Sequence, residues 1–363
     1  MNQPLAAFVG GIPFPGRTEL PLPPRHPALT GVVTFDLDIS DDVVQKVRIE
    51  PGWLHRGAEK LFEVRDYRSL IMLGDRHDWF SSSTGELVIT LAVEQAMRLS
   101  PPPRATWLRT LLAELARIHS HLAFLGIVDE RVWHGVDAVR ELLVALSGNR
   151  IHPMLSRVGG MATDAPPAWL DAVADALPRL RTIADGVAER LAASGDRFRG
   201  VAVLTADDCR RYGVTGPAAR AAGIDLDLRV RGALARPEVF RPTTLRTEGD
   251  AHSRLAILTE EVHTSTLMVE DLLAAAPDGP VETRLSRRLK VPEGKHLAEI
   301  EAPWGLASAL LVSRGGQTPW RLALRTPTFH NVAAMEHALI GLHPAQIPDG
   351  IASLGYAVGD LDK

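Results

Sequence analysis

Alternating apolar and polar residues predict a β-hairpin over residues 31–50. A polar turn at Ser40-Asp41-Asp42 separates its two apolar arms, and Pro51-Gly52 ends the second arm. A period of two is typical of strands that bury one face. The apolar positions are Val33, Phe35, Leu37 and Ile39 in the first arm and Val43, Val44, Val47 and Ile49 in the second.

From residue 53 onward the apolar residues follow helical spacing. Ser83 and Glu86 match a capping box, which predicts a helix that begins there and ends at the proline run 101–103. A second helix is predicted over 104–126, because its apolar residues recur at alternating intervals of three and four, as in packed bundles. Further helices are predicted over 136–146, 169–193, 253–276 and 328–342, and Pro178 is expected to break or kink the one over 169–193.

The last part of the chain returns to strand-like patterns. Apolar stretches over 306–313 and 320–325 flank Arg314-Gly315-Gly316-Gln317, which predicts a second hairpin. The expected fold class is therefore α+β, mainly a helical bundle with β-hairpins near the N- and C-terminal ends. It divides into a Pro-rich, irregular N-terminal arm (1–25), a β-hairpin region (26–52) and a helical domain that carries the C-terminal hairpin (53–363).

Composition excludes several classes of protein. Hydrophobic residues make up 45% and charged residues 23%, which is ordinary for a globular chain and excludes a disordered one. The net charge of −4 offers no basic surface, so no nucleic-acid partner is expected. No run of about 18 apolar residues predicts a membrane span. Residues 1–24 lack the pattern of a signal peptide, so a cytoplasmic location is expected.

No metal or dinucleotide site is expected in the chain. Cys209 is the only cysteine, so an internal disulfide, a CxxC pair and the cysteine ligands of zinc, iron–sulfur or nickel–iron sites are excluded. Four histidines are candidates for metal ligands, but their spacing matches no known ligand motif. The glycine pairs lack the pattern of a phosphate-binding loop, so they do not indicate a dinucleotide site. The histidines are His26, His55, His121 and His152.

Eight short segments, taken in order, carry a family resemblance. They are His26-Pro27-Ala28-Leu29-Thr30-Gly31, Gly52-Trp53-Leu54-His55-Arg56-Gly57-Ala58-Glu59-Lys60, Asp75-Arg76-His77-Asp78-Trp79, Glu114-Leu115-Ala116-Arg117-Ile118-His119-Ser120-His121, Ser147-Gly148-Asn149-Arg150-Ile151-His152, Gly213-Val214-Thr215-Gly216-Pro217, Glu301-Ala302-Pro303-Trp304-Gly305 and Gly359-Asp360-Leu361-Asp362-Lys363. Together they resemble the hydrogenase-like D subunit of NADH:quinone oxidoreductase, respiratory complex I, a family related to the large subunit of nickel–iron hydrogenases. The resemblance spans about residues 26–363 and implies a hydrogenase-large-subunit-like fold over 53–363.

The resemblance also implies a place in a larger assembly. Members of that family pack against an iron–sulfur subunit that holds a 4Fe–4S cluster, with the quinone chamber between the two. They carry no cofactor themselves, quinone is the substrate, and NADH acts elsewhere in the complex. The implied partners are this iron–sulfur subunit, the other peripheral-arm subunits and the membrane-arm subunits. The implied location is peripheral, on the cytoplasmic face of a bacterial cell membrane.

At two positions the chain departs from the family's quinone contacts. Thr30 stands where the family has a histidine, and Trp79 where it has a tyrosine. Neither side chain releases a proton near neutral pH, so direct proton donation from them is not expected, and His77 or His55 could take over. Arg76 matches an arginine near the cluster, where it would stabilise the reduced form; the alternative is a surface ion pair with Asp78. The implied chamber residues are His26, Thr30, His55, Arg76, His77, Asp78 and Trp79.

A second group of polar residues falls on one helix. Glu114, Arg117 and His121 are spaced to share one face of the helix over 104–126. The resemblance groups them with Arg150 and Glu301 in a polar network, and the alternative is a structural salt bridge between helices. Two other assignments stay open: a nickel-free large subunit of a membrane hydrogenase-like or formate-hydrogenlyase-like complex, and a non-catalytic assembly subunit.

Overall fold

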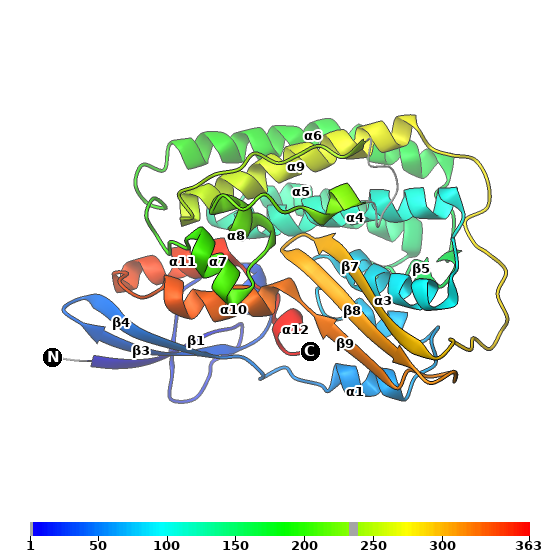
Figure 1. Ribbon diagram of the computed structural model, residues 1–363. Helices are drawn as coiled ribbons and strands as arrows, with labels where there is room; N and C mark the ends of the chain where they lie inside the picture. The colour runs from blue at the N-terminus through cyan, green and yellow to red at the C-terminus, as the bar shows by residue number, and fades with distance from the viewer. Residues whose placement is uncertain (1–2, 232–238) are drawn as a thin grey trace.

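The computed structural model describes residues 3–231 and 239–363 of the chain. Figure 1 shows long helices lying side by side along one edge of the molecule, an N-terminal sheet below them, and a C-terminal sheet beside helix α3. The long helices are α4 (Pro103–Phe124), α5 (Val132–Ser147), α6 (Pro167–Ala192) and α9 (Ala251–Ala274). Most strands fall near the two ends of the chain and most helices between them, so the expected α+β class is confirmed.

Helix α4 lies in the centre of the molecule. Every residue from Trp107 to Phe124 is buried, and the helix contacts α3, α5 and α9. The predicted apolar seam therefore accounts for only part of its surface. Its other face carries charged side chains, and because charge is seldom buried without a partner, those side chains must find partners inside the protein.

Helix α6 differs from the prediction at Pro178. The helix is continuous over Pro167–Ala192, so a break is not found. Pro178 lies on the exposed side, while Val173, Leu177 and Leu180 are buried against the bundle. The packing of this apolar face stabilises the helix more than one missing backbone hydrogen bond destabilises it.

The N-terminal sheet has the strand order β2-β1-β3-β4. The hairpin predicted over 31–50 is confirmed as β3 (Val33–Ser40) and β4 (Val43–Glu50). The arm expected to be irregular instead contains β1 (Gln3–Val9), which pairs antiparallel with β3, and β2 (Thr18–Glu19). Ala7, Phe8 and Val9 are buried, so β1 gains its stability from the sheet that it joins.

The C-terminal sheet consists of β7 (Gly294–Ala302), β8 (Gly305–Ser313) and β9 (Arg321–Arg325). The predicted hairpin is β8–β9, and β7 was not predicted. Helix α3 (Ser82–Met97) contacts β7 and β8. The predicted capping box is wrong: Ser81 is the N-cap, and Glu86 accepts from the backbone N–H of Ser156 at 2.7 Å.

The remaining elements are short. They are α1 (Ala58–Glu63), α2 (Ile71–Gly74), α7 (Ala206–Tyr212), α8 (Gly216–Ala221), α10 (Pro327–Ala338), α11 (Ile347–Leu354), α12 (Val358–Leu361), β5 (Ser156–Arg157), β6 (Gly160–Met161) and the 3-10 turns η1 (Pro27–Thr30), η2 (Leu125–Ile127), η3 (Leu228–Arg231) and η5 (Pro344–Gln346). Helix α10 corresponds to the helix predicted over 328–342, but it ends at Ala338. Figure 1 places α12 and the C-terminus between the two sheets.

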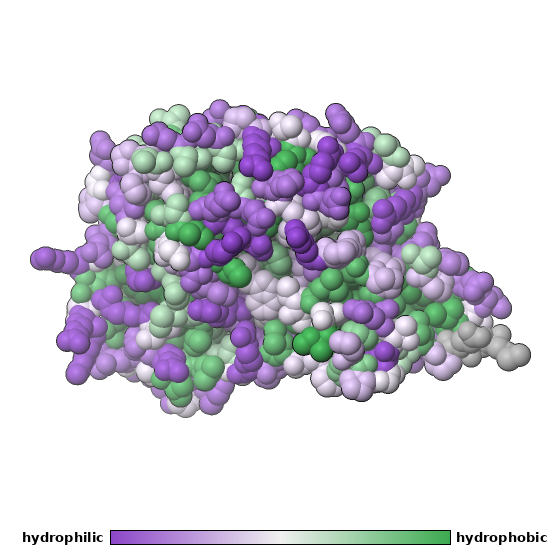
Figure 2. All heavy atoms as spheres, turned by 180° about the vertical axis from the view of Figure 1, so that it is seen from behind, coloured by the Kyte–Doolittle hydropathy of each residue, from purple (hydrophilic) through white to green (hydrophobic). Residues whose placement is uncertain are grey.

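The surface mixes polar and apolar residues. Figure 2 shows the face opposite to Figure 1, where hydrophilic residues predominate over the helical half and hydrophobic residues are more frequent near the N-terminal sheet. Among residues 3–231 and 239–363, no helix combines the length and the apolar character that crossing a bilayer requires.

Candidate functional site

The C-terminal helix α12 touches both loops that the sequence singled out. A Cβ atom built on Gly31 would lie 2.8 Å from Cγ1 of Val358. One built on Gly359 would lie 2.3 Å from the backbone oxygen of His77 and 2.7 Å from Cζ3 of Trp79. Only glycine allows approaches this close. The loop over 26–31 and the turn over 75–79 therefore meet on the same C-terminal segment.

The two substituted positions differ in their surroundings. Thr30 is exposed, and its hydroxyl donates to the backbone oxygen of Pro27 at 2.7 Å, within the η1 turn. Trp79 is half-buried, and its indole N–H is buried without an acceptor among the described residues. A buried N–H without an acceptor is uncommon in folded proteins, so Trp79 offers a donor that nothing in the described chain uses.

The histidines of this region are mostly buried and neutral. Burial lowers the pKa of His26 to about 3 and that of His77 to about 4. Nδ1 of His26 accepts from the N–H of Ala28 at 3.2 Å, and Nδ1 of His77 lies 3.4 Å from the oxygen of Gly359. His55 is exposed. The His77 ring is therefore not protonated to a cation at neutral pH.

Arg76 pairs with a different acid from the one considered in the sequence. Its Nε donates to Oδ1 of Asp75 at 2.9 Å, so the alternative pair with Asp78 is not formed. The Arg76 side chain is 42% exposed, and Nδ1 of His152 lies 3.6 Å from Oδ2 of Asp75. Burial raises the pKa of Asp75 to about 6 and that of neighbouring Glu86 to about 8. Arg76 therefore sits at the surface above a buried acidic group.

A pair of buried acids lies behind the turn. Asp78 accepts from the N–H of Phe80 at 3.0 Å, and Asp360 accepts from the hydroxyl of Thr328 at 3.1 Å. Both line a cavity of about 30 Å³ that His77 also lines. Burial raises the pKa of Asp78 to about 6, and burial together with the charge of Asp78 raises the pKa of Asp360 well above its usual range.

A separate charge network lies inside the helical half. It consists of Glu114, Arg117 and His121 of α4, Arg220 of α8, Asp227 and Arg229 near η3, Glu261 of α9 and Glu301 of β7. All of these residues are buried or nearly so.

Glu261 is the centre of the charge network. Its Oε1 accepts from Nη2 and Nε of Arg220 at 2.7 and 3.0 Å, and its Oε2 lies 2.9 Å from Nε2 of His121 and 3.5 Å from Arg117. Arg117 also donates to the backbone oxygen of Glu301 at 2.8 Å. Burial opposes ionisation, but the charge of Arg220, the hydrogen bond with His121 and the charge of Arg117 hold the pKa of Glu261 well below its usual range.

The charge network contains all but one of the residues that the sequence grouped. Arg150 lies outside it: its side chain is 64% exposed and approaches Asp137 at 3.5 Å. Sequence reasoning missed Glu261, Arg220, Asp227 and Arg229. A signal for Glu261 was present, because an acid between Leu258 and Val262 on an apolar helix face indicates a buried partner.

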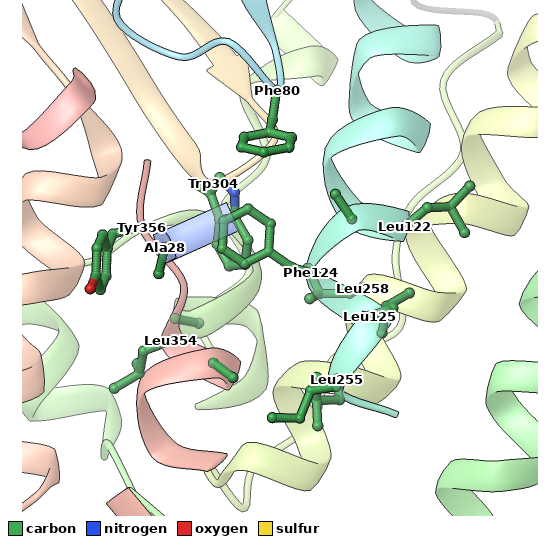
Figure 3. Close-up of a cluster of buried hydrophobic side chains, with 14 of the residues drawn as sticks. Ala28, Phe80, Leu122, Phe124, Leu125, Leu255, Leu258, Trp304, Leu354 and Tyr356 are labelled. Atoms are coloured by element: carbon green, nitrogen blue, oxygen red, sulfur yellow. The ribbon is translucent and has the colours of Figure 1, made fainter. Parts of the chain in front are cut away.

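An aromatic cluster separates the charge network from the η1 turn. Figure 3 shows Trp304 and Phe124 together between Ala28, Phe80 and Tyr356. The rings of Phe124 and Trp304 have centroids 4.4 Å apart, and Trp304 is 1% exposed. Trp304 therefore fills the core between the charge network and the η1 turn.

No cation site is visible in the described ranges. Among residues 3–231 and 239–363, no three His, Cys, Asp or Glu side chains gather so that they could hold a metal ion. Cys209 is buried, and burial raises the pKa of its thiol to about 11. A thiol in this state is not a reactive nucleophile at neutral pH.

Comparison with known proteins gives a consistent family. The family described as "Respiratory-chain NADH dehydrogenase, 49 Kd subunit" matches residues 131–289 and 283–363. The Salinispora arenicola protein named as D subunit 2 of NADH-quinone oxidoreductase is 41% identical over 359 residues, which cover 94% of this chain and 92% of the relative. The protein of the same name from Streptomyces griseus is 39% identical, covering 98% and 95%. The D subunit of Geobacillus thermodenitrificans is 31% identical, covering 95% and 99%.

These matches extend over nearly the whole chain, and the family match, which reaches residue 363, includes helix α12. The chain therefore belongs to the family of the respiratory-chain NADH dehydrogenase 49-kDa subunit, the D subunit of NADH-quinone oxidoreductase.

Proposed function

We propose that this chain forms one wall of the quinone chamber in an NADH:quinone oxidoreductase, beside an iron–sulfur subunit that holds a 4Fe–4S cluster. The observation that carries the proposal is the position of α12, which brings Gly31 and Trp79 against one C-terminal segment. The names of the relatives support it, because the proteins from Salinispora, Streptomyces and Geobacillus are all D subunits of NADH-quinone oxidoreductase. The chain would act as a peripheral subunit, with NADH oxidised elsewhere in the complex.

The chamber needs a partner to complete it. The cavity beside His77 and Asp78 has about 30 Å³, room for about one water and far too little for a quinone headgroup. Thr30 is exposed, so a neighbouring subunit placed over it would enclose a larger space. The quinone is therefore expected between the two subunits.

Arg76 would face the cluster of the iron–sulfur subunit. Its guanidinium is 42% exposed and is fixed by Asp75, and the nearby residues Met72 and Ile151 are exposed apolar side chains that a partner could cover. A fixed positive charge beside an iron–sulfur cluster stabilises its more negative, reduced form. Electron delivery to quinone would then depend on this side chain.

The test is the Arg76→Ala variant in the assembled complex, with decylubiquinone as acceptor. We expect reductase turnover to fall at least about tenfold, equivalent to about 1.4 kcal/mol, and the cluster to become harder to reduce in a redox titration followed by electron paramagnetic resonance. Arg210→Ala is the control, because Arg210 forms an exposed pair with Asp207 on α7. Normal turnover and normal cluster reduction in Arg76→Ala would remove the assignment.

One observation favours a second candidate, a non-catalytic assembly subunit. The Thr30 hydroxyl is already bonded to Pro27, and Trp79 replaces the phenol that the family uses. Under this alternative the wild-type complex assembles with the iron–sulfur subunit but reduces no quinone. The same assay therefore separates the two candidates.

A further inference from the structure

We propose that Asp78 and Asp360 form a carboxyl pair that shares one proton beside a water-sized cavity, and that this pair supplies a proton for quinone reduction in place of the family's histidine and tyrosine, where this chain has Thr30 and Trp79. The proposal rests on the function proposed above. It concerns residues that the family resemblance did not assign to proton transfer.

The surroundings of the pair favour a single shared charge. Asp78 is 7% exposed and Asp360 4% exposed, and neither forms an ion pair with a cation among the described residues. Ionising two neighbouring buried carboxylates together costs much free energy, because like charges repel strongly where water is excluded. Asp360 of α12 also accepts a hydrogen bond at Oδ2 from the hydroxyl of Thr328, in the first turn of α10, which stabilises one negative charge.

A second observation points to a bound water and a mobile proton. The cavity of about 30 Å³ is lined by both acids and by His77. Nε2 of His77 is buried and has no hydrogen-bond partner among the described residues. A cavity of this size holds a water when it has polar groups to bond it, and these three side chains provide them. The pair, the water and His77 then form a chain that ends beside Trp79.

The other charged groups around the pair do not supply a permanent counter-ion. Arg325 lines the cavity, but its guanidinium donates to the backbone oxygens of Leu306 and Gly213. Lys363 lowers the pKa of Asp360 only as a minor effect, and its ammonium group donates to the backbone oxygen of Leu324 and lies 3.9 Å from Glu59. His77 is neutral because burial lowers its pKa to about 4.

The proton balance is simple. A quinone gains two electrons, from the cluster of the iron–sulfur subunit, and two protons to become a quinol. One proton leaves the pair through the cavity water, and the other comes from solvent. The loss leaves two buried negative charges side by side, which is unfavourable, so the pair takes a proton back from solvent before the next turnover.

A first experiment tests proton sharing without using activity. In the full chain with carbon-13-labelled Asp, infrared spectra should show a protonated Asp carboxyl that persists to about pH 7.5, since carboxyls are ordinarily ionised above about pH 5. Asp360→Asn and Asp78→Asn should each remove the band. A wild-type chain with no protonated Asp at about pH 7 overturns the proposal, even if neither variant folds.

Thermal unfolding gives an independent readout. A raised pKa adds stability that is present at low pH and is lost as pH rises through the folded-state value. Asp360→Asn removes this loss, so its melting temperature should exceed that of wild type at about pH 8 and match it near pH 5. The control Asp207→Asn, at an exposed position, should follow wild type at both values. An equal decrease at both pH values would mean that the pair is only structural.

The assembled complex then tests the role in turnover. With decylubiquinone, Asp360→Asn and Asp78→Asn should lower kcat at least about tenfold, keep KM and flatten the pH profile, while Asp207→Asn changes none of these. Unchanged kcat and pH profile would overturn the role in quinone reduction. If the wild-type complex reduces no quinone, the proposed function fails, and the infrared and unfolding results still decide whether the pair shares a proton.

Discussion

Replacing Glu261 with Gln removes one negative charge from the centre of the charge network. The carboxylate accepts two hydrogen bonds from Arg220 and lies close to His121 and Arg117, and its side chain is 0% exposed. Gln has nearly the same shape but is neutral, and its amide N–H₂ would face donors. The variant therefore leaves buried guanidinium groups without their counter-charge.

The expected magnitude follows from burial. Breaking a buried ion pair by removing one partner costs about 3–5 kcal/mol, because the remaining charge stays desolvated. The neighbouring Glu260→Gln is the matched control: Glu260 is 33% exposed and pairs with Arg246 near the surface. Surface pairs contribute about 0–1 kcal/mol, so the control should change stability little.

Urea unfolding of the full chain, followed by circular dichroism, measures both variants. The free energy of unfolding should fall by about 3–5 kcal/mol in Glu261→Gln and by less than about 1 kcal/mol in Glu260→Gln. The pKa of Glu261 is lowered by folding, so this carboxylate contributes stability that is present above its unfolded-state pKa of about 4.5. That stability is lost as the pH falls through the folded-state pKa. Wild type should therefore lose more stability in acid than Glu261→Gln. Equal losses in the two variants would refute the reasoning.

Two further predictions concern the C-terminal helix and the substituted contacts. Gly359→Ala should lower the free energy of unfolding, measured in urea, by about 1–3 kcal/mol, because its methyl group would overlap the backbone of His77. The control Gly316→Ala, where the nearest atom lies 3.9 Å from the added carbon, should change this free energy little. An equal effect of both variants would contradict the close packing of α12. Thr30→His combined with Trp79→Tyr should raise decylubiquinone turnover of the complex if the lost titratable groups limit it. No gain in turnover would show that these two positions are not what limits it.

The helical bundle and both hairpins could be predicted because their signals are local. The spacing in 104–126 is a property of consecutive residues, and it correctly placed Glu114, Arg117 and His121 on one face. The same logic failed for β1, whose apolar residues do not alternate with polar ones and which forms a strand by pairing with β3. It failed also at Glu86, which bonds to Ser156 across 70 residues of sequence instead of capping its own helix.

The sequence alone determines which side chains share a helix face and which family the motifs resemble. With one cysteine, it also excludes disulfides and cysteine-ligated metal sites within the chain. Which charges meet depends instead on the three-dimensional packing. Arg117 and Glu301 are 184 residues apart and lie together, whereas Arg150, grouped with them by resemblance, lies on the surface. Asp78 and Asp360 likewise meet only because α12 folds back against the turn at Trp79. Periodicity acts over a few residues, but the partner of a buried charge is set by packing between distant segments, which no local pattern encodes.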